Sequence, residues 1–346
     1  MNLHDVKIRL QQHLSDGLVV VVGSGLSCAE GLPGMGALAD HLLATVGDGL
    51  VGTEAAAWEA IGPLIKANGL EAALLEKPPT AILESAIAAM TAALISERER
   101  SVVAEVFAGT RILRLTKLVH HLLKPSSGLP IITTNYDRLV EIAVEEAGLG
   151  ADTMFFGRFA GTLNERESQL SFCRDVVLKK SRVTYTFKPR ALVCKPHGSL
   201  DWYLRNGQPV SYAGELAGAS RLIITPGHNK FRNGYDSPFD HHRGRANEAI
   251  DRASRFLIIG YGFNDDHLET HLSPAIKGGK PTLMMTHSLS HAATAMATGW
   301  PNVIALDHAQ QGGVDGTRVI IDKTNLFFPG LPLWDVHTFI TEILEP

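Results

Sequence analysis

Short apolar runs alternate with helical periodicities along this chain. Several runs of apolar and β-branched residues lack the polar alternation of a half-exposed strand, which is typical of strands buried on both faces of a parallel sheet. These predicted strands lie at 18–22, 131–134, 192–194, 222–225, 256–259, 282–286, 303–306 and 318–321, and residues 153–156 and 183–187 are also strand-like.

Apolar residues at three- and four-residue steps predict helices between these runs. The predicted helices cover 2–16, 38–46, 139–147, 247–253, the region around 268–272 and a closing segment over 334–344. Strands that alternate with helices in this way indicate an α/β protein with a doubly wound parallel sheet.

Residues 51–123 differ from the rest because they are rich in Ala, Leu and Glu and contain few strand formers. We expect an Ala-rich helical insertion over 51–124, and an α/β core built from 1–50 and 125–346. Such a block could cover the site as a lid, form an oligomer interface or simply pack, and its composition favours packing or oligomerisation.

Three strand ends carry unusual loops, at 23–34, 133–137 and 260–266. In open α/β sheets ligands bind outside the carboxyl ends of the strands, so we expect the binding cleft where these loops meet. The first loop contains Gly23, Gly25 and two further glycines, and it opens into a helix. This arrangement suits a pyrophosphate, although glycine-rich turns are common and Cys28 breaks the dehydrogenase pattern G-x-G-x-x-G.

Polar side chains follow two other strands. Asn135 and Asp137 come directly after 131–134, where they could line a site or cap the next helix. His197 stands on a Pro-His-Gly turn after 192–194. Histidine is the side chain best suited to move protons near neutral pH, although a single histidine is more often structural.

Composition excludes several classes of protein. The formal net charge is −4, so no overall basic field favours nucleic-acid binding, and a partner would have to bring any nucleic acid. No apolar run is long enough to span a bilayer, and no signal peptide is visible. The three cysteines form no C-x-x-C pair, which indicates neither a zinc site nor a disulfide framework and fits a reducing cytoplasm. His228, His241 and His242 lie in one polar loop, but their spacing matches no metal-ligand pattern.

Together these segments resemble the sirtuin-like family. The resemblance lies in the glycine loop followed by Gly-Leu-Pro at 31–33, a Thr-x-Asn-x-Asp strand end at 133–137, the His-Gly turn at 197–198 and the GYGFNDDHL segment at 260–268. It covers the α/β core and not the helical block. It implies a Rossmann-like domain that binds NAD as its substrate and cleaves the bond between nicotinamide and ribose.

The resemblance also implies roles for individual residues. Asn135 would orient the nicotinamide ribose or an attacking water, and His197 would be the general base. Asp137 would meet the nicotinamide carboxamide. The implied cofactor-binding residues are Gly23, Ser24, Gly25, Ser27, Pro33, Thr133, Asp137, Gly260 and Tyr261, of which Gly23 to Ser27 would line the pyrophosphate and ribose and the last two the adenosine half.

The chain departs from deacylating sirtuins in three places. It lacks their two cysteine pairs, so no zinc is expected, and Met35-Gly36 and Thr134 replace residues that those enzymes usually carry. Sirtuin-like proteins without the zinc module resemble NAD-consuming effectors of bacterial anti-phage systems. The resemblance therefore implies an NAD glycohydrolase in the cytoplasm that forms homo-oligomers, with a HerA-type ATPase partner or a phage-derived trigger.

Other functions stay open from the sequence. One alternative is an NAD-dependent deacylase or ADP-ribosyltransferase, which would need an acylated or acceptor protein. Another is a module that binds NAD or ADP-ribose as a sensor without turnover, although a chain with both Asn135 and His197 is less expected to be one. A nuclease subunit is disfavoured because no carboxylate cluster for two metal ions stands out.

Overall fold

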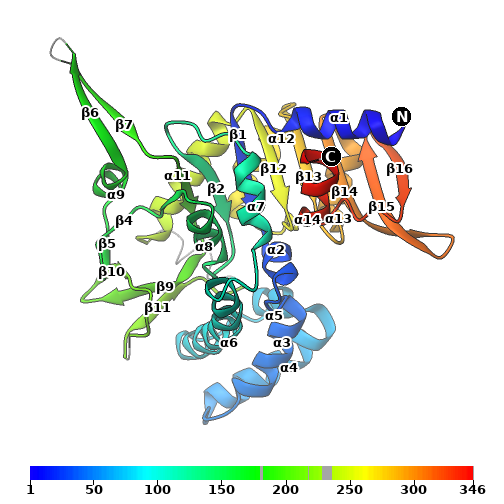
Figure 1. Cartoon of the computed structure of the whole chain (residues 1–346). Helices are drawn as coiled ribbons and strands as arrows, with labels where there is room; N and C mark the ends of the chain where they lie inside the picture. Colours follow the sequence, from blue (N-terminus) through cyan, green and yellow to red (C-terminus); the bar gives the residue numbers. More distant parts are fainter. Residues whose placement is uncertain (180–181, 217, 228–235, 346) are drawn as a thin grey trace.

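A largely parallel sheet forms the centre of the molecule (Figure 1). The computed structural model describes residues 1–179, 182–216, 218–227 and 236–345. The sheet has the order β16-β15-β14-β13-β12-β1-β2-β8-β3. The neighbours from β14 to β3 in this order pair in parallel, and β15 and β16 extend the β14 edge as antiparallel strands. Its strands are β1 (Leu18–Val22), β2 (Leu129–Thr133), β3 (Gly150–Asp152), β8 (Arg190–Cys194), β12 (Arg255–Ile259), β13 (Thr282–Met285), β14 (Val303–Gln311), β15 (Val314–Ile321) and β16 (Thr324–Pro329).

Helices cover both faces of this sheet, as the doubly wound prediction requires. All five residues of β1 are buried, and they alternate between two separate cores: Val20 and Val22 pack into one, Val19 and Val21 into the other. The first core includes α1 (Leu3–His13), α7 (Arg114–His121), α8 (Leu139–Glu146), α14 (Val336–Phe339) and the π-helix η1 (Ile340–Leu344). The second includes α11 (Phe239–Arg252), α12 (Asp266–Lys277) and α13 (His291–Gly299).

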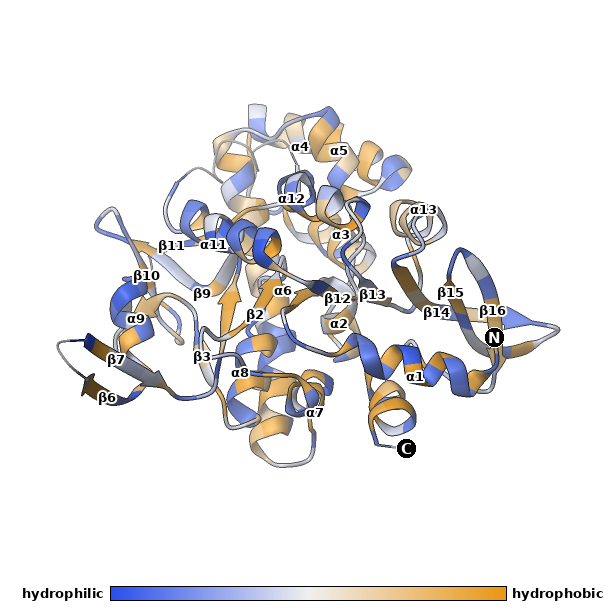
Figure 2. Ribbon diagram, turned by 90° about the horizontal axis from the view of Figure 1, so that it is seen from above, coloured by the Kyte–Doolittle hydropathy of each residue, from blue (hydrophilic) through white to orange (hydrophobic). Residues whose placement is uncertain are grey.

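The view from above makes the layers visible. Figure 2 shows hydrophobic colour on strands of the sheet and mixed colours on the helices beside it, with α11, α12 and α13 on one side and α1, α7 and α8 on the other. The α/β class and the Rossmann-like, doubly wound architecture are therefore confirmed. None of the helices that the structure describes is long and apolar enough to cross a membrane.

The helical block has a core of its own. It contains α3 (Met35–Thr45), α4 (Thr53–Asn68), α5 (Leu70–Glu76) and α6 (Ala81–Phe107), whose buried apolar side chains form one cluster. The second half of α6 instead contributes Val102 and Val106 to the main core. Packing thus joins α3 to the helices after residue 50, while the boundaries 51 and 124 stay predictions.

A second sheet and a ribbon lie beside β8. The sheet has the antiparallel order β11-β9-β10-β5-β4, and β6 and β7 form a ribbon that extends away from the core (Figure 1). The predicted strands at 183–187 and 222–225 therefore do not join the main sheet. The bounds are β4 (Phe155–Phe156), β5 (Gly161–Leu163), α9 (Glu165–Ser171), β6 (Cys173–Lys179), β7 (Arg182–Phe187), β9 (Gly198–Arg205), β10 (Gln208–Ser211) and β11 (Ser220–Ile223).

Several predicted boundaries were wrong, two of them in helices. The N-terminal helix ends at His13, because Leu14 leaves the helical conformation. The helix predicted at 247–253 begins at Phe239, so His241 and His242 lie on α11 and not in a loop. His228, the third histidine of that predicted loop, lies outside the described residues.

Candidate active site

The candidate site lies where the sheet changes direction along the chain. The chain adds β2 and β8 on one side of the central strand β1, and β12, β13 and β14 on the other. The loops after β1, β2, β8 and β12 therefore all leave the sheet at the carboxyl ends of its parallel strands. This is the place where α/β sheets bind ligands.

Three glycines hold the ends of β1 and β12 together. A Cβ atom on Gly23 would lie 2.4 Å from the carbonyl oxygen of Gly260, and one on Gly25 would lie 2.7 Å from its Cα. Gly260 also has a φ of +60°, which favours glycine. The N–H of Gly25 donates to the Gly260 carbonyl at 2.9 Å. These glycines thus join two strand ends, and the N–H of Gly25 is already used within the protein.

The loops after β1, β2, β8 and β12 enclose a cavity of about 210 Å³, called the first cavity below. Helices α3, α5 and α6 contribute Leu38, Glu71 and Ile95 to its wall. Most of the predicted site residues line it, namely Gly23, Ser24, Ser27, Pro33, Asn135, Asp137, His197 and Tyr261. Three do not: Gly25 and Gly260 line a neighbouring cavity, and Thr133 lies fully buried behind Asn135, whose N–H donates to its hydroxyl oxygen at 3.1 Å.

Hydrogen bonds fix Asn135 and Asp137 to the short helix α2 (Ser24–Ala29). The amide nitrogen of Asn135 donates to the Gly23 carbonyl at 3.0 Å and to the Ser27 hydroxyl at 2.8 Å. The Ser27 hydroxyl donates to Asp137 at 2.7 Å, and the other carboxylate oxygen of Asp137 accepts the N–H of Leu139 at 3.1 Å. Asp137 therefore both caps α8 and lines the cavity, so it is at once a helix cap and a candidate site residue.

Burial raises the pKa of the Asp137 carboxyl, and the nearby Lys195 ammonium and the Ser27 hydrogen bond oppose that rise. Lys195 itself is fully buried. Its ammonium group donates to Glu141 at 3.0 Å and to the backbone carbonyl of Asp137. The ammonium group thus holds the Asn135–Asp137 loop through its backbone and not through the side chains that line the first cavity.

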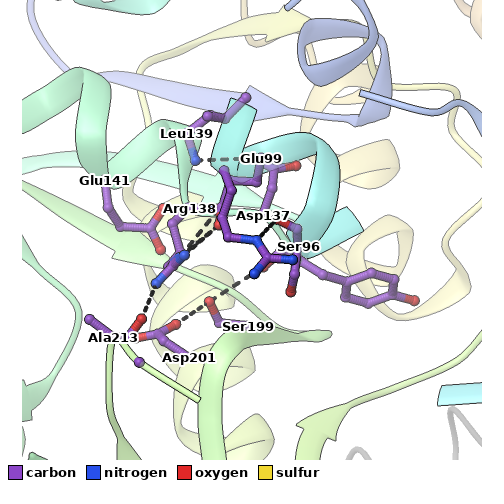
Figure 3. A network of polar contacts seen from close by, with 12 residues as sticks. Ser96, Glu99, Asp137, Arg138, Leu139, Glu141, Ser199, Asp201 and Ala213 are labelled. Carbon is purple, nitrogen blue, oxygen red and sulfur yellow. Dashed lines mark hydrogen bonds and ion pairs between the residues drawn. The ribbon is translucent and has the colours of Figure 1, made fainter. Parts of the chain in front are cut away.

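A further ion pair supports the same loop from the side of α6. Figure 3 shows Arg138 between Glu99 and the carbonyl oxygen of Ala213. Its guanidinium contacts the fully buried Glu99 carboxylate at 2.5 Å. The loop after β2 is therefore fixed before any ligand binds, which keeps Asn135 and Asp137 in one geometry.

His197 faces a carboxylate that the sequence analysis did not select. Its Nε2 lies 2.5 Å from Oδ2 of Asp265, and both side chains are less than a tenth exposed. The other oxygen of Asp265 accepts the N–H groups of His267 at 3.0 Å and Leu268 at 3.2 Å, which caps α12. The sequence does show Asp265 as an acidic residue at a strand-to-helix turn. Acidic residues at such turns are common helix caps, so this position alone does not distinguish Asp265 from an ordinary cap.

A second cavity of about 420 Å³ adjoins the first. Gly25 and Gly260 line it together with Arg114, His287 and Trp334. The rings of His287 and Trp334 meet edge to face, with centroids 4.8 Å apart. The indole N–H of Trp334 is buried and has no hydrogen-bond partner among the residues that the structure describes. The sequence analysis did not single out Arg114, His287 or Trp334.

Two of the three histidines that were predicted to lie in a polar loop, His241 and His242, belong to the described residues, and they lie on α11. His242 is fully buried, and its Nδ1 accepts the N–H of Lys195 at 3.1 Å, so it supports the strand end that leads to His197. His241 is exposed on α11. Over the described ranges, no group of three or more His, Cys, Asp or Glu side chains is arranged to hold a metal ion.

Comparison with known proteins identifies the class of protein. A family model described as a SIR2-like domain matches residues 130–295, which contain Asn135, His197 and Asp265. No curated protein matches the chain. Similar solved structures include a complex of a Sir2 homologue with NAD, which is 12% identical at a TM-score of 0.41 and covers 83% of this chain and 84% of that one. Another is Sir2Tm bound to a propionylated peptide, which is 12% identical at a TM-score of 0.41 and covers 84% and 89%. These two likenesses are distant and carry no argument about function.

Residues 130–295 are therefore similar to a SIR2-like domain. This domain associates the protein with a family of NAD-related enzymes. The first glycine loop, Arg114 and Trp334 lie outside the matched range.

Proposed function

We propose that this protein is an NAD glycohydrolase, which converts NAD and water to ADP-ribose and nicotinamide. One observation carries the proposal: Asn135, Asp137 and His197, from the ends of two strands, line one cavity and are each at most 8% exposed. Loss of nicotinamide leaves a cationic, oxocarbenium-like ribose. Fixed polar groups in a site with little water stabilise such a centre more than water does.

The two cavities suit the two halves of the dinucleotide. The nicotinamide ribose is assigned to the first cavity, where His197 acts as general base and Asn135 orients the ribose or the attacking water. Adenosine is assigned to the second, where Trp334 and His287 offer flat aromatic surfaces. Arg114 also lines this cavity, and its guanidinium pairs there with Glu30 and Asp335. Residues 23–26 and 259–262 contribute to both cavities, so one extended ligand could pass between them.

The test follows nicotinamide release from NAD by the purified protein. His197→Ala should lower the rate by about 10²–10⁴-fold, the usual contribution of a general base. His271→Ala is the matched control, because His271 pairs with Asp251 at the surface and lies outside both cavities. Equal rates for the two variants would contradict the role of His197. Tight NAD binding without nicotinamide release would favour a binding module, and release that requires an acylated protein would favour a deacylase.

The biological role that we propose is that of a cytoplasmic effector in bacterial anti-phage defence, which depletes NAD on infection. It includes homo-oligomers and a HerA-type ATPase partner or a phage-derived trigger. The resemblance of the sequence motifs supports this role, and the exposed apolar side chains of the β6–β7 ribbon, such as Leu178 and Tyr185, are consistent with assembly. Cells that express the wild-type chain should restrict phage, and cells that express His197→Ala should not.

A further inference from the structure

The turn between β12 and α12 holds Asp265 rigidly beside His197. Tyr261 and Phe263 of this turn are buried, and their ring centroids lie 5.2 Å apart. Phe263 has a φ of +57°, and the Ser290 hydroxyl donates to the Gly262 carbonyl at 2.6 Å. A non-glycine residue at positive φ persists only where surrounding contacts hold it. The carboxylate therefore has little freedom to leave the imidazole.

The two oxygens of Asp265 have different partners. Oδ1 accepts two backbone N–H groups at the N-terminus of α12, and Oδ2 lies 2.5 Å from Nε2 of His197. Backbone donors and the positive end of a helix both favour the ionised carboxylate. This contact is an ion pair and not an aligned hydrogen bond. A lone pair on Nε2 would repel an ionised carboxylate oxygen 2.5 Å away, so the nitrogen that faces the carboxylate must carry the proton.

We propose that Asp265 is a positioning residue for His197, which it holds with the proton on Nε2 so that Nδ1 is the basic nitrogen. This inference rests on the proposed hydrolysis of NAD. The bond between C1′ and the nicotinamide nitrogen breaks, and its electron pair leaves with nicotinamide. The oxygen of water forms the new bond to C1′, and its proton passes to Nδ1 of His197 and then to solvent. The Asp265 carboxylate stabilises the imidazolium that forms in between.

The chain offers a closely matched pair of variants. Asp265→Asn keeps an oxygen for the helix cap, since asparagine caps as well as aspartate, but removes the charge beside His197. Asp266→Asn removes a charge from the next residue, which is exposed on the first turn of the same helix and lines neither cavity. Both substitutions change the local charge equally, and only the first changes the partner of the imidazole.

Steady-state kinetics with NAD give the first readout. We expect Asp265→Asn to lower kcat by about 10²–10⁴-fold, as for an aspartate that orients a catalytic histidine, and to change KM by less than about threefold. Asp266→Asn should match the wild type. A kcat for Asp265→Asn equal to that of Asp266→Asn would overturn the inference and leave the hydrolase assignment intact.

Nitrogen-15 spectra of the histidine side chains give a second readout that needs no turnover. With the His197 signals assigned by their loss in His197→Ala, the wild type should show the Nε2–H tautomer, and Asp265→Asn should shift the ring toward Nδ1–H. A wild-type ring protonated on Nδ1 alone would overturn the inference. Failure of the wild type to release nicotinamide would overturn the proposed hydrolysis, whereas the tautomer would still report on the pairing with Asp265.

Discussion

The two cavities share a wall of glycines but differ in what surrounds them. Buried polar groups line the first, and the protein itself holds them: Asn135 by Gly23 and Ser27, and His197 by Asp265. Aromatic rings and a guanidinium line the second, in His287, Trp334 and Arg114. Fixed hydrogen-bonding groups suit the step in which bonds break and form, whereas flat aromatic rings suit the binding of a nucleotide base.

This difference separates two kinds of kinetic effect. A group that acts mainly on the transition state lowers kcat when removed, and a group that binds substrate and transition state equally raises KM. We therefore expect kcat defects from the first cavity, KM defects from the second, and both from the glycines between them.

Among three further substitutions, Asn135→Ala, Gly260→Ala and Trp334→Ala, the largest effect is expected from Asn135→Ala. Removal of the amide takes one hydrogen bond each from the Ser27 hydroxyl and the Gly23 carbonyl, and it leaves the ribose without an orienting group. The kcat for nicotinamide release should fall by about 10²–10³-fold, the size found when one preorganised polar group is removed. Calorimetric titration should show that the Kd for NAD changes much less. A large loss of binding with a normal kcat would instead make Asn135 a binding residue.

Gly260→Ala should affect both cavities. Its Cβ would lie 2.5 Å from the backbone nitrogen of Leu26, and its φ of +60° is unfavourable for alanine. Gly279→Ala is the control, since Gly279 has a φ of +101° but no atom within 4 Å of the added Cβ. We expect Gly260→Ala to cost about 1–3 kcal/mol of unfolding free energy beyond the control, and to impair kcat and KM together. Equal denaturation curves for the two variants would show that the strand ends separate freely.

Local sequence patterns predicted much of the fold, and most of the candidate site residues that they indicated line one cavity. β1 reads LVVVV and is buried throughout, which confirms the predicted strand that is buried on both faces of the sheet. Asn135, Asp137 and His197 each follow a strand directly, and parallel strands bring their carboxyl ends to one edge. A site built from strand ends is therefore visible in the sequence without any knowledge of packing.

The missed features depend on contacts between distant segments. Asp265 resembled a cap, and only the fold shows that its second oxygen meets His197. Trp334 reaches the second cavity from the end of the chain, and Glu71 reaches the first from α5. His242 seemed a loop residue because the start of α11 was placed too late, although the structure buries it under Lys195. No periodicity within one segment records such contacts.

The smallest of these effects is expected from Trp334→Ala, and it is the sharpest test of the second cavity. Loss of a stacking surface for adenine costs about 1–3 kcal/mol, so KM for NAD should rise by roughly 5- to 150-fold while kcat stays near the wild-type value. Trp334→Phe keeps an aromatic face and should restore most of the affinity, which separates stacking from a general loss of packing. Nicotinamide mononucleotide lacks the adenosine half, so its hydrolysis should be the same in the wild type and Trp334→Ala. An equal loss for both substrates would mean that Trp334 stabilises the fold and does not bind adenine, and the division of the ligand between the two cavities would then be wrong.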